Sequence, residues 1–246
     1  MIRSLIKRCG YEIVRLNTPA SHFHSDRYVR FNSRRLEHLA SLRIAVAGMS
    51  VLEVGAGIGD HSHYYIDRGC KITITEARFE NLRYLRNRYP AGDIRFLDIE
   101  HLSPVNGSPF EVVHCYGILH HLGNPDQALE FISRNTGKML FLETLVSFGE
   151  KEERNIVREP QRDPTQAYSG IGCRPTRPWV FNQLRGLFEY VYLPKTQPNH
   201  EDFPIDWNTP DEQQADPKNA IFIASREKIE NELLTETLIN KQARHE

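Results

Sequence analysis

A buried strand that runs directly into a glycine-rich turn constrains this chain most. Residues 51–54, Val-Leu-Glu-Val, have the apolar composition of a strand that is covered on both faces, as in a parallel sheet. Gly55, Gly57 and Gly59 follow at once, and glycine lets a backbone turn sharply and approach a ligand closely. The segment after Gly59 has a helical pattern, so its free N–H groups would point back at that ligand.

An acid after the next strand indicates what kind of ligand this is. Residues 71–75, Lys-Ile-Thr-Ile-Thr, read as a second strand, and Glu76 ends it. An acid at this place accepts hydrogen bonds from the two ribose hydroxyls of a bound nucleoside. The sequence therefore predicts a nucleoside cofactor.

The glycine spacing selects among nucleoside cofactors. The dinucleotide fingerprint is G-x-G-x-x-G, whereas this turn reads G-x-G-x-G, and Asp60 stands where the third dinucleotide glycine belongs. A carboxylate beside a pyrophosphate is repelled, but a positively charged sulfonium is not. The phosphate loop G-x-x-x-x-G-K-[ST] is missing from the turn, which argues against ATP and GTP.

Over residues 45 to 145 the chain resembles the class I S-adenosylmethionine (SAM) dependent methyltransferases. The resemblance rests on the glycine turn, on Asp98 after an expected third strand, and on residues 111–122, which end in His-His-Leu. Residues 138–143 are similar to the fifth strand of that family. The resemblance implies a Rossmann-like α/β fold: a seven-stranded, mostly parallel sheet with helices on both faces and an antiparallel last strand.

The same resemblance assigns roles to individual residues. It implies that Gly55, Gly57 and Gly59 wrap the methionine portion of SAM and that Glu53 orients its ammonium group. Glu76 would hold the ribose and Asp98 the adenine amino group, and Tyr116 is expected among the cofactor contacts.

A second resemblance is to bacterial methyltransferases that are encoded with polysaccharide or secondary-metabolite genes. It rests on residues 35–39, 172–179 and 196–207. It implies a small-molecule acceptor, such as a hydroxyl of a sugar or secondary metabolite, and identifies no common substrate.

The alternation of strand and helix patterns over residues 51–145 independently favours βαβ units and a parallel sheet. We expect a helical cap over residues 1–48 and a methyltransferase domain over 49–246, with a substrate or lid segment at 147–219. Residues 220–224 should be the last strand, and 227–243 a polar helical tail.

Methyl transfer from a sulfonium requires alignment of donor and acceptor and control of one proton on the acceptor. A hydroxyl is a poor nucleophile, so a general base is useful, and His120 and His121 follow the expected fourth strand, where cofactor and acceptor meet in the family. Both are expected to be catalytic. His200 with nearby carboxylates such as Glu201 and Asp206 suits a divalent metal, but clusters of this kind are usually solvated loops, and no metal is expected.

Composition limits the other functions. Lysine and arginine number 31 against 32 acidic residues, so no global field attracts nucleic acid, and no nucleic-acid partner is expected. A nicotinamide-dependent oxidoreductase is disfavoured by Asp60, and a non-catalytic SAM-binding or regulatory protein remains an alternative.

The setting of the protein is expected to be the cytoplasm. Four scattered cysteines without a C-x-x-C pair fit reduced thiols, and no segment approaches the roughly 20 apolar residues that span a bilayer. Residues 1–16 include a short basic amphipathic pattern that leaves membrane-surface contact open, although packing on the domain is the simpler interpretation. The oligomeric state is left open.

Overall fold

A central sheet of eight strands organises the part of the chain that the computed structural model describes, which is residues 19–161, 163, 165–208 and 216–245. The strands follow one another across the sheet in the order β11 (Leu234–Thr235), β8 (Tyr190–Pro194), β10 (Lys218–Ser225), β5 (Thr136–Val146), β4 (Phe110–Tyr116), β1 (Ser50–Glu53), β2 (Lys71–Glu76) and β3 (Asp93–Phe96).

The pairing of these strands confirms the expected fold. Strands β1 to β5 are mutually parallel, and β10 lies antiparallel between β5 and β8. The two-residue strand β11 adds an eighth member at the edge next to β8. Strand order reverses at β1, which has β2 on one side and β4 on the other, and open α/β sheets bind ligands at such a switch point.

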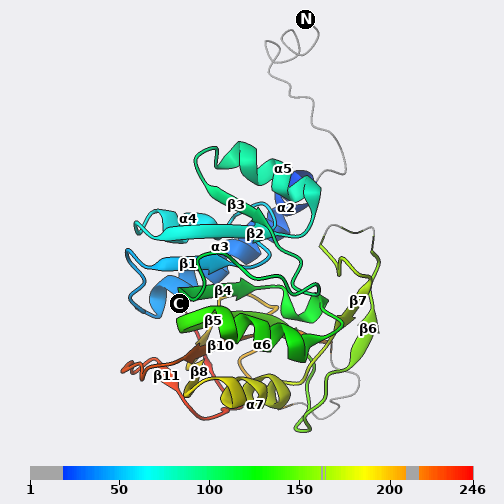
Figure 1. Cartoon of the computed structure of the whole chain (residues 1–246). Helices are drawn as coiled ribbons and strands as arrows, with labels where there is room; N and C mark the ends of the chain where they lie inside the picture. The colour runs from blue at the N-terminus through cyan, green and yellow to red at the C-terminus, as the bar shows by residue number, and fades with distance from the viewer. Residues whose placement is uncertain (1–18, 162, 164, 209–215, 246) are drawn as a thin grey trace, which may run out of the picture.

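Helices cover both faces of the sheet (Figure 1). Their bounds are α2 (Pro19–Phe23), α3 (Asp26–Ser41), α4 (Ser62–Ile66), α5 (Phe79–Arg88), the 3₁₀ turn η1 (Leu119–His121), α6 (Pro125–Asn135) and α7 (Arg177–Leu187). One hydrophobic cluster joins α6 and α7 to alternate strand residues such as Leu140 and Leu142. A second joins α3 and α4 to the intervening residues, including Met139 and Phe141, so both faces of the sheet are buried.

The helix expected after Gly59 is shorter than its sequence pattern suggests. Two carbonyl groups of the turn are engaged from α5: Arg88 donates to the carbonyl of Ile58 at 2.8 Å, and the Tyr89 hydroxyl to that of Gly59 at 2.6 Å. The regular helix α4 consequently begins only at Ser62.

The segment between β5 and α7 contains a small antiparallel hairpin, β6 (Ile156–Arg158) with β7 (Ile171–Cys173). It belongs to the region 147–219 that we expect to be a substrate or lid segment. The division into a cap over 1–48 and a domain over 49–246 stays a prediction. Residues 1–16, with their basic pattern, lie outside the described residues.

The prediction of a helical tail over 227–243 is wrong. This segment runs along the edge of the sheet in turns, contributing β11 and then β12 (Ala243–Arg244), which pairs in parallel with β9 (Thr196–Gln197). Its apolar residues Ile229, Leu234 and Leu238 pack on the two cores. Burial of these side chains against an existing surface overrides the weak helical preference of a polar sequence.

Candidate cofactor and acceptor site

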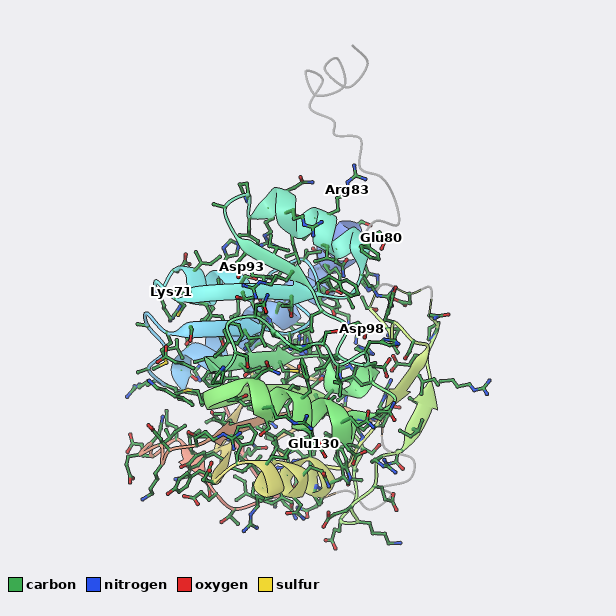
Figure 2. The ribbon with its side chains drawn as sticks, viewed as in Figure 1. Lys71, Glu80, Arg83, Asp93, Asp98 and Glu130 are labelled. Carbon is green, nitrogen blue, oxygen red and sulfur yellow. The ribbon has the colours of Figure 1, made fainter. Side chains whose placement is uncertain are left out.

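A cavity opens at the carboxyl ends of β1, β2 and β4. Figure 2 shows the polarity of the sheet, because Lys71, at the start of β2, and Asp98, just beyond β3, lie at opposite ends of the strands. The walls combine the glycine turn, the strand-end acids, residues of α3 and part of the segment that follows the hairpin strand β6.

The glycine turn is a close-fitting cradle. Gly55, Gly57 and Gly59 have φ values of +67°, +59° and +82°, which L side chains rarely adopt. A Cβ on Gly55 would lie 2.0 Å from Cδ1 of Ile118, and one on Gly57 would lie 3.3 Å from the Phe23 ring. Glycine is therefore required at Gly55 for both backbone conformation and space.

Glu76 is held rigidly beside this turn. Its carboxylate accepts N–H groups of Gly57, Ala77 and Arg78, each at 2.8 Å. Burial raises the pKa of Glu76, and these backbone donors oppose the shift. A fixed acceptor at this edge of the cavity fits a ribose hydroxyl pair.

Asp98 lines the same cavity between Leu97 and Ile99, whose apolar side chains are buried. Its two oxygens accept the N–H of Glu100 at 3.0 Å and contact Nδ1 of His101 at 2.8 Å. An acid between apolar neighbours suits a flat heterocycle with an exocyclic amino group.

Two further acids, Glu53 and Asp60, lie near the turn and differ in their burial and in their partners. Glu53 is buried, accepts the Ser62 hydroxyl at 2.5 Å, and has its pKa raised to about 8 by desolvation. Asp60 instead pairs with Arg88 at 2.6 Å and accepts the amide of Asn32 at 3.2 Å. The charge of Asp60 is thus partly balanced, which the glycine spacing did not reveal.

The α3 side of the cavity holds a buried ion pair that sequence reasoning missed. Arg35 of α3 binds Glu143 of β5, and neither side chain is exposed to solvent by more than 7%. Among the described residues, Arg35 Nε, Glu143 Oε1 and the hydroxyl of Tyr116 have no hydrogen-bond partner. Buried polar atoms of this kind are normally satisfied, so they indicate a place for a polar ligand.

A row of buried rings lies under the turn. The Tyr65 hydroxyl is 2.9 Å from Nδ1 of His114, and Nε2 of His114 is 3.1 Å from Nδ1 of His61. Burial lowers the pKa of His114 to about 3 and that of His61 well below its ordinary value, so both are neutral. His61 Nε2 has no partner among the described residues, and His61 lines the cavity.

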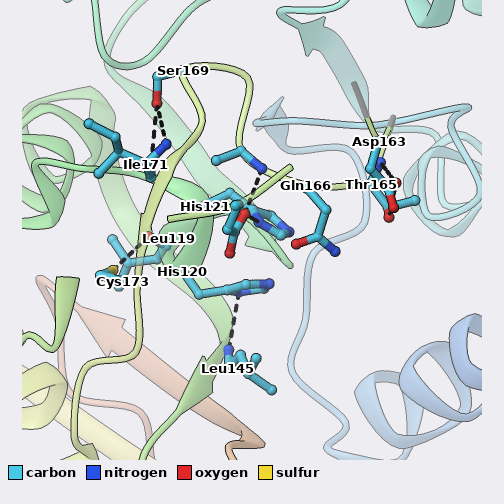
Figure 3. A network of polar contacts seen from close by, with 12 residues as sticks. Leu119, His120, His121, Leu145, Asp163, Thr165, Gln166, Ser169, Ile171 and Cys173 are labelled. Atoms are coloured by element: carbon cyan, nitrogen blue, oxygen red, sulfur yellow. Dashed lines mark hydrogen bonds and ion pairs between the residues drawn. The ribbon is translucent and has the colours of Figure 1, made fainter. Parts of the chain in front are cut away.

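The two histidines after β4 have different environments. His120 is buried, and its Nδ1 accepts the N–H of Leu145 at 3.1 Å, as Figure 3 shows. His121 lines the cavity, and its Nδ1 lies 2.6 Å from Oε2 of Glu159. The structure thus brings His121 to the cavity together with Glu53, Glu76, Asp98 and Tyr116, whereas His120 is engaged by the backbone.

The loop candidates for metal binding have other partners. Nδ1 of His200 accepts the N–H of Asp202 at 3.2 Å, Glu201 pairs with Arg30 at 2.8 Å, and Asp206 accepts the N–H of Asn208 at 2.9 Å. Within the described ranges, no group of three or more histidine, cysteine or acidic side chains could hold a metal ion. Those ranges also contain no helix of the length and apolar character that a membrane span requires.

Comparison with known proteins finds a family model that matches part of this chain. Residues 52–138, from β1 to β5, match a family model described as a methyltransferase domain. The match is consistent with a class I SAM-dependent methyltransferase domain. SAM, the cofactor expected from the resemblance, is the methyl donor of that class.

Solved structures share the fold of this chain. The N-terminal domain of EvdMO1 with SAH bound is 20% identical and has a TM-score of 0.62, covering 79% of this chain and 80% of that chain. A putative S-adenosylmethionine dependent methyltransferase from Listeria monocytogenes is 13% identical with a TM-score of 0.57, covering 81% of this chain and 100% of that chain.

Curated relatives match a smaller part. The tRNA U34 carboxymethyltransferases of Haemophilus influenzae and Pasteurella multocida are each 32% identical over 126 residues. The match covers 48% of this chain and 37% of the length of those relatives.

Proposed function

We propose that this methyltransferase transfers the methyl group of SAM to a hydroxyl of a small molecule, such as a sugar or secondary metabolite. The observation that carries the proposal is the position of His121, which lines the same cavity as the glycine turn and has one ring nitrogen held by a buried carboxylate. A cytoplasmic location fits the described cysteines, Cys70, Cys115 and Cys173, which are all free thiols.

The cofactor half of the site follows from the cavity. Gly55 and Gly57, which line the cavity, and Gly59 of the same turn would carry the methionine portion, with Glu53 toward its ammonium group and Tyr116 nearby. Glu76 and Asp98 would hold the ribose and the adenine. When bound, SAM supplies an activated methyl group and leaves as a neutral thioether.

His121 is the general base in this proposal. A neutral imidazole that faces the acceptor takes the hydroxyl proton as the new carbon–oxygen bond forms, and general base catalysis contributes about 10²- to 10⁴-fold. His120 is the weaker candidate, because its Nδ1 already accepts the Leu145 N–H and the ring lies outside the cavity wall.

The shape of the cavity favours a small acceptor. Tyr28 and Asn32 of α3 lie on one side, and Gln166 and Tyr168 of the segment after β6 on another, so the site is lined from several elements. A nucleic-acid acceptor, as the names of the curated relatives suggest for those proteins, would need a basic face, whereas this chain has a formal net charge of −1.

The experiment that tests the proposal has two stages. The first is calorimetric titration of the purified protein with S-adenosylhomocysteine, with NADH as control. Micromolar binding of the first compound alone supports the cofactor assignment, whereas binding of NADH or of neither compound contradicts it.

The second stage measures methyl transfer from labelled SAM to a panel of sugars, nucleotide sugars and phenols, with transfer RNA as the competing acceptor. Turnover of a small hydroxyl that falls at least 10²-fold in His121→Asn, with unchanged S-adenosylhomocysteine affinity, supports the proposal. Turnover of transfer RNA alone would contradict the acceptor class. Binding without turnover of any acceptor would favour the non-catalytic alternative.

A further inference from the structure

We propose that Glu159 is a positioning residue that holds His121 in the one neutral tautomer whose Nε2 can take a proton from the acceptor. This inference rests on the proposed function. The carboxylate lies 38 positions after the histidine in the sequence, in the segment that connects β6 to β7.

The contacts of Glu159 fix both of its oxygens. Oε2 lies 2.6 Å from Nδ1 of His121 and accepts the backbone N–H of Ala167, also at 2.6 Å. Oε1 accepts the guanidinium of Arg174 at 2.7 Å. The side chain is only 2% exposed, so the carboxylate cannot turn away into solvent.

Glu159 is ionised in this setting. Burial alone would raise its pKa, but the hydrogen bonds from His121, from Arg174 and from the backbone N–H of Ala167 outweigh burial and lower the pKa of Glu159 to about 2. An ionised carboxylate only accepts hydrogen bonds. Nδ1 of His121 must therefore carry its proton, and in the neutral ring Nε2 is left with the lone pair.

Nε2 is the nitrogen that remains for the cavity. The described residues make no hydrogen bond to it, whereas Nδ1 is fully engaged on the side of the hairpin. His121 and Gln166 both line the cavity, and Figure 3 shows the two side chains in one view. The ring thus has one nitrogen toward Glu159 and one for the acceptor.

The backbone around this pair is closely fitted. A Cβ on Gly172 of β7 would lie 2.7 Å from Oε1 of Glu159 and 2.6 Å from the carbonyl oxygen of His120. Arg174 spans the same gap, donating to the carbonyl of His120 at 3.1 Å as well as to Glu159. The hairpin is therefore attached directly to the turn that carries His121.

The proposed step couples methyl transfer to proton transfer. The acceptor oxygen forms a bond to the methyl carbon while the carbon–sulfur bond breaks and its electron pair stays on sulfur. Nε2 of His121 takes the hydroxyl proton, and the resulting imidazolium is stabilised by the carboxylate of Glu159. The proton then passes to solvent, which restores the neutral ring.

Three charged or titratable groups of the described residues surround His121. Glu159 contacts its ring directly, Arg174 pairs with that carboxylate, and the His120 ring centroid lies 4.0 Å from that of His121. Burial lowers the pKa of His120 well below its ordinary value, so His120 is neutral. Glu159 is thus the one anion among them that can stabilise a charged His121.

The first test reads the tautomer by ¹⁵N NMR of histidine-labelled protein, with His121 assigned by comparison with His121→Asn. We expect the neutral ring of His121 in the wild type to carry its proton on Nδ1 and to leave Nε2 unprotonated. Glu159→Gln should shift His121 toward the opposite tautomer or a mixture, and Glu159→Asp should restore the original one in part.

The matched control is Asp126→Asn, which removes the exposed ion pair of Asp126 with Arg154 and should leave the His121 signals unchanged. A wild-type His121 protonated at Nε2 would overturn the proposal, and that result does not depend on whether Glu159→Gln folds.

The second test is kinetic. Glu159→Gln should lower kcat about 10- to 100-fold with little change in KM or in S-adenosylhomocysteine affinity. In the His121→Asn background the same substitution should cost almost nothing further. Equal losses in both backgrounds, or a loss confined to cofactor affinity, would show that Glu159 only anchors the hairpin.

The two tests separate this proposal from the proposed function. NMR reads the tautomer without any acceptor or methyl donor. The tautomer of His121 can therefore be tested even if no turnover is found.

Discussion

Arg35 of helix α3 and Glu143 of strand β5 form an ion pair that is buried beside the cavity, 108 positions apart in the sequence. The guanidinium also lies over the Phe31 ring, 3.8 Å from its centroid, and it approaches Gly117 at the end of β4. The pair thus attaches helix α3 to the strand ends that bear the site.

Removing one partner of this pair should destabilise the fold strongly. Arg35→Met leaves the Glu143 carboxylate buried and uncompensated, which costs about 3–5 kcal/mol in comparable pairs. Urea unfolding should show this loss, whereas the double variant Arg35→Met with Glu143→Leu should recover most of it. Arg34→Met, at the partly exposed pair with Glu37, should change stability by about 0.5 kcal/mol or less. An equally small effect at Arg35 would contradict the argument.

Alanine in the glycine turn should abolish cofactor binding. Gly55→Ala forces a left-handed backbone on alanine and places its Cβ against Ile118, so we expect loss of S-adenosylhomocysteine binding and about 1–3 kcal/mol of destabilisation. Gly186→Ala is the control, because this glycine lies in α7 with nothing within 4 Å of the added Cβ. It should bind normally and gain about 0.5–1 kcal/mol. Calorimetry and thermal unfolding measure both effects.

Glu76 should be required for cofactor binding, whereas its exposed neighbour Glu80 should not be. Glu76→Gln keeps the size of the side chain and an acceptor for the turn but removes the charge. Charge-assisted hydrogen bonds contribute roughly 1.5–3 kcal/mol each, so S-adenosylhomocysteine affinity should fall at least about 10-fold. Glu80→Gln, on the first turn of α5, should bind like the wild type. Equal S-adenosylhomocysteine affinities of the two variants would show that Glu76 does not bind the cofactor.

The buried acid Glu53 should make stability depend on pH. Its pKa is raised to about 8, well above its ordinary value, so the folded protein holds a proton that the unfolded chain releases. This contribution is fully present below about pH 4.5 and is lost as the pH rises through 8. The melting temperature of the wild type should therefore fall more steeply between about pH 5 and 8 than that of Glu53→Gln. Parallel curves would show that Glu53 is ionised throughout.

Cofactor binding should reveal the same proton. If the ammonium group of the ligand lies against Glu53, binding favours the ionised carboxyl, and S-adenosylhomocysteine should release a proton near neutral pH. Titrations in buffers of different ionisation enthalpy measure that release, and Glu53→Gln serves as the control. No difference between buffers for the wild type would place the ammonium group elsewhere.

Much of the fold could be predicted because its signals are local. The run from Val51 to Gly59 encodes a strand and its turn within nine residues, and Glu76 and Asp98 follow their strands directly. The tail at 227–243 could not be predicted, because its conformation is set by a surface that exists only once the sheet has formed.

The acceptor side of the site was harder to predict from the sequence for a similar reason. Nothing near Glu159 in the sequence shows that its partner is His121, and nothing near Arg35 points to Glu143. Gly172 is the one local signal, a glycine in a strand pattern that marks a close backbone approach. Its meaning becomes clear only when the Glu159 carboxylate is seen beside it.

The row of rings under the glycine turn also decides which histidine can act on the acceptor. The Tyr65 hydroxyl has one described partner, Nδ1 of His114, and an O–H group left without an acceptor is costly in a buried place. Tyr65 therefore donates, His114 passes its own N–H to Nδ1 of His61, and Nε2 of His61 must carry a proton. His61 faces the cavity as a permanent donor. Three imidazoles line the cavity, and they differ in what their ring nitrogens can do. His114 is engaged at both nitrogens, and His61 can only donate a hydrogen bond from Nε2, whereas Nε2 of His121 is left to receive a proton.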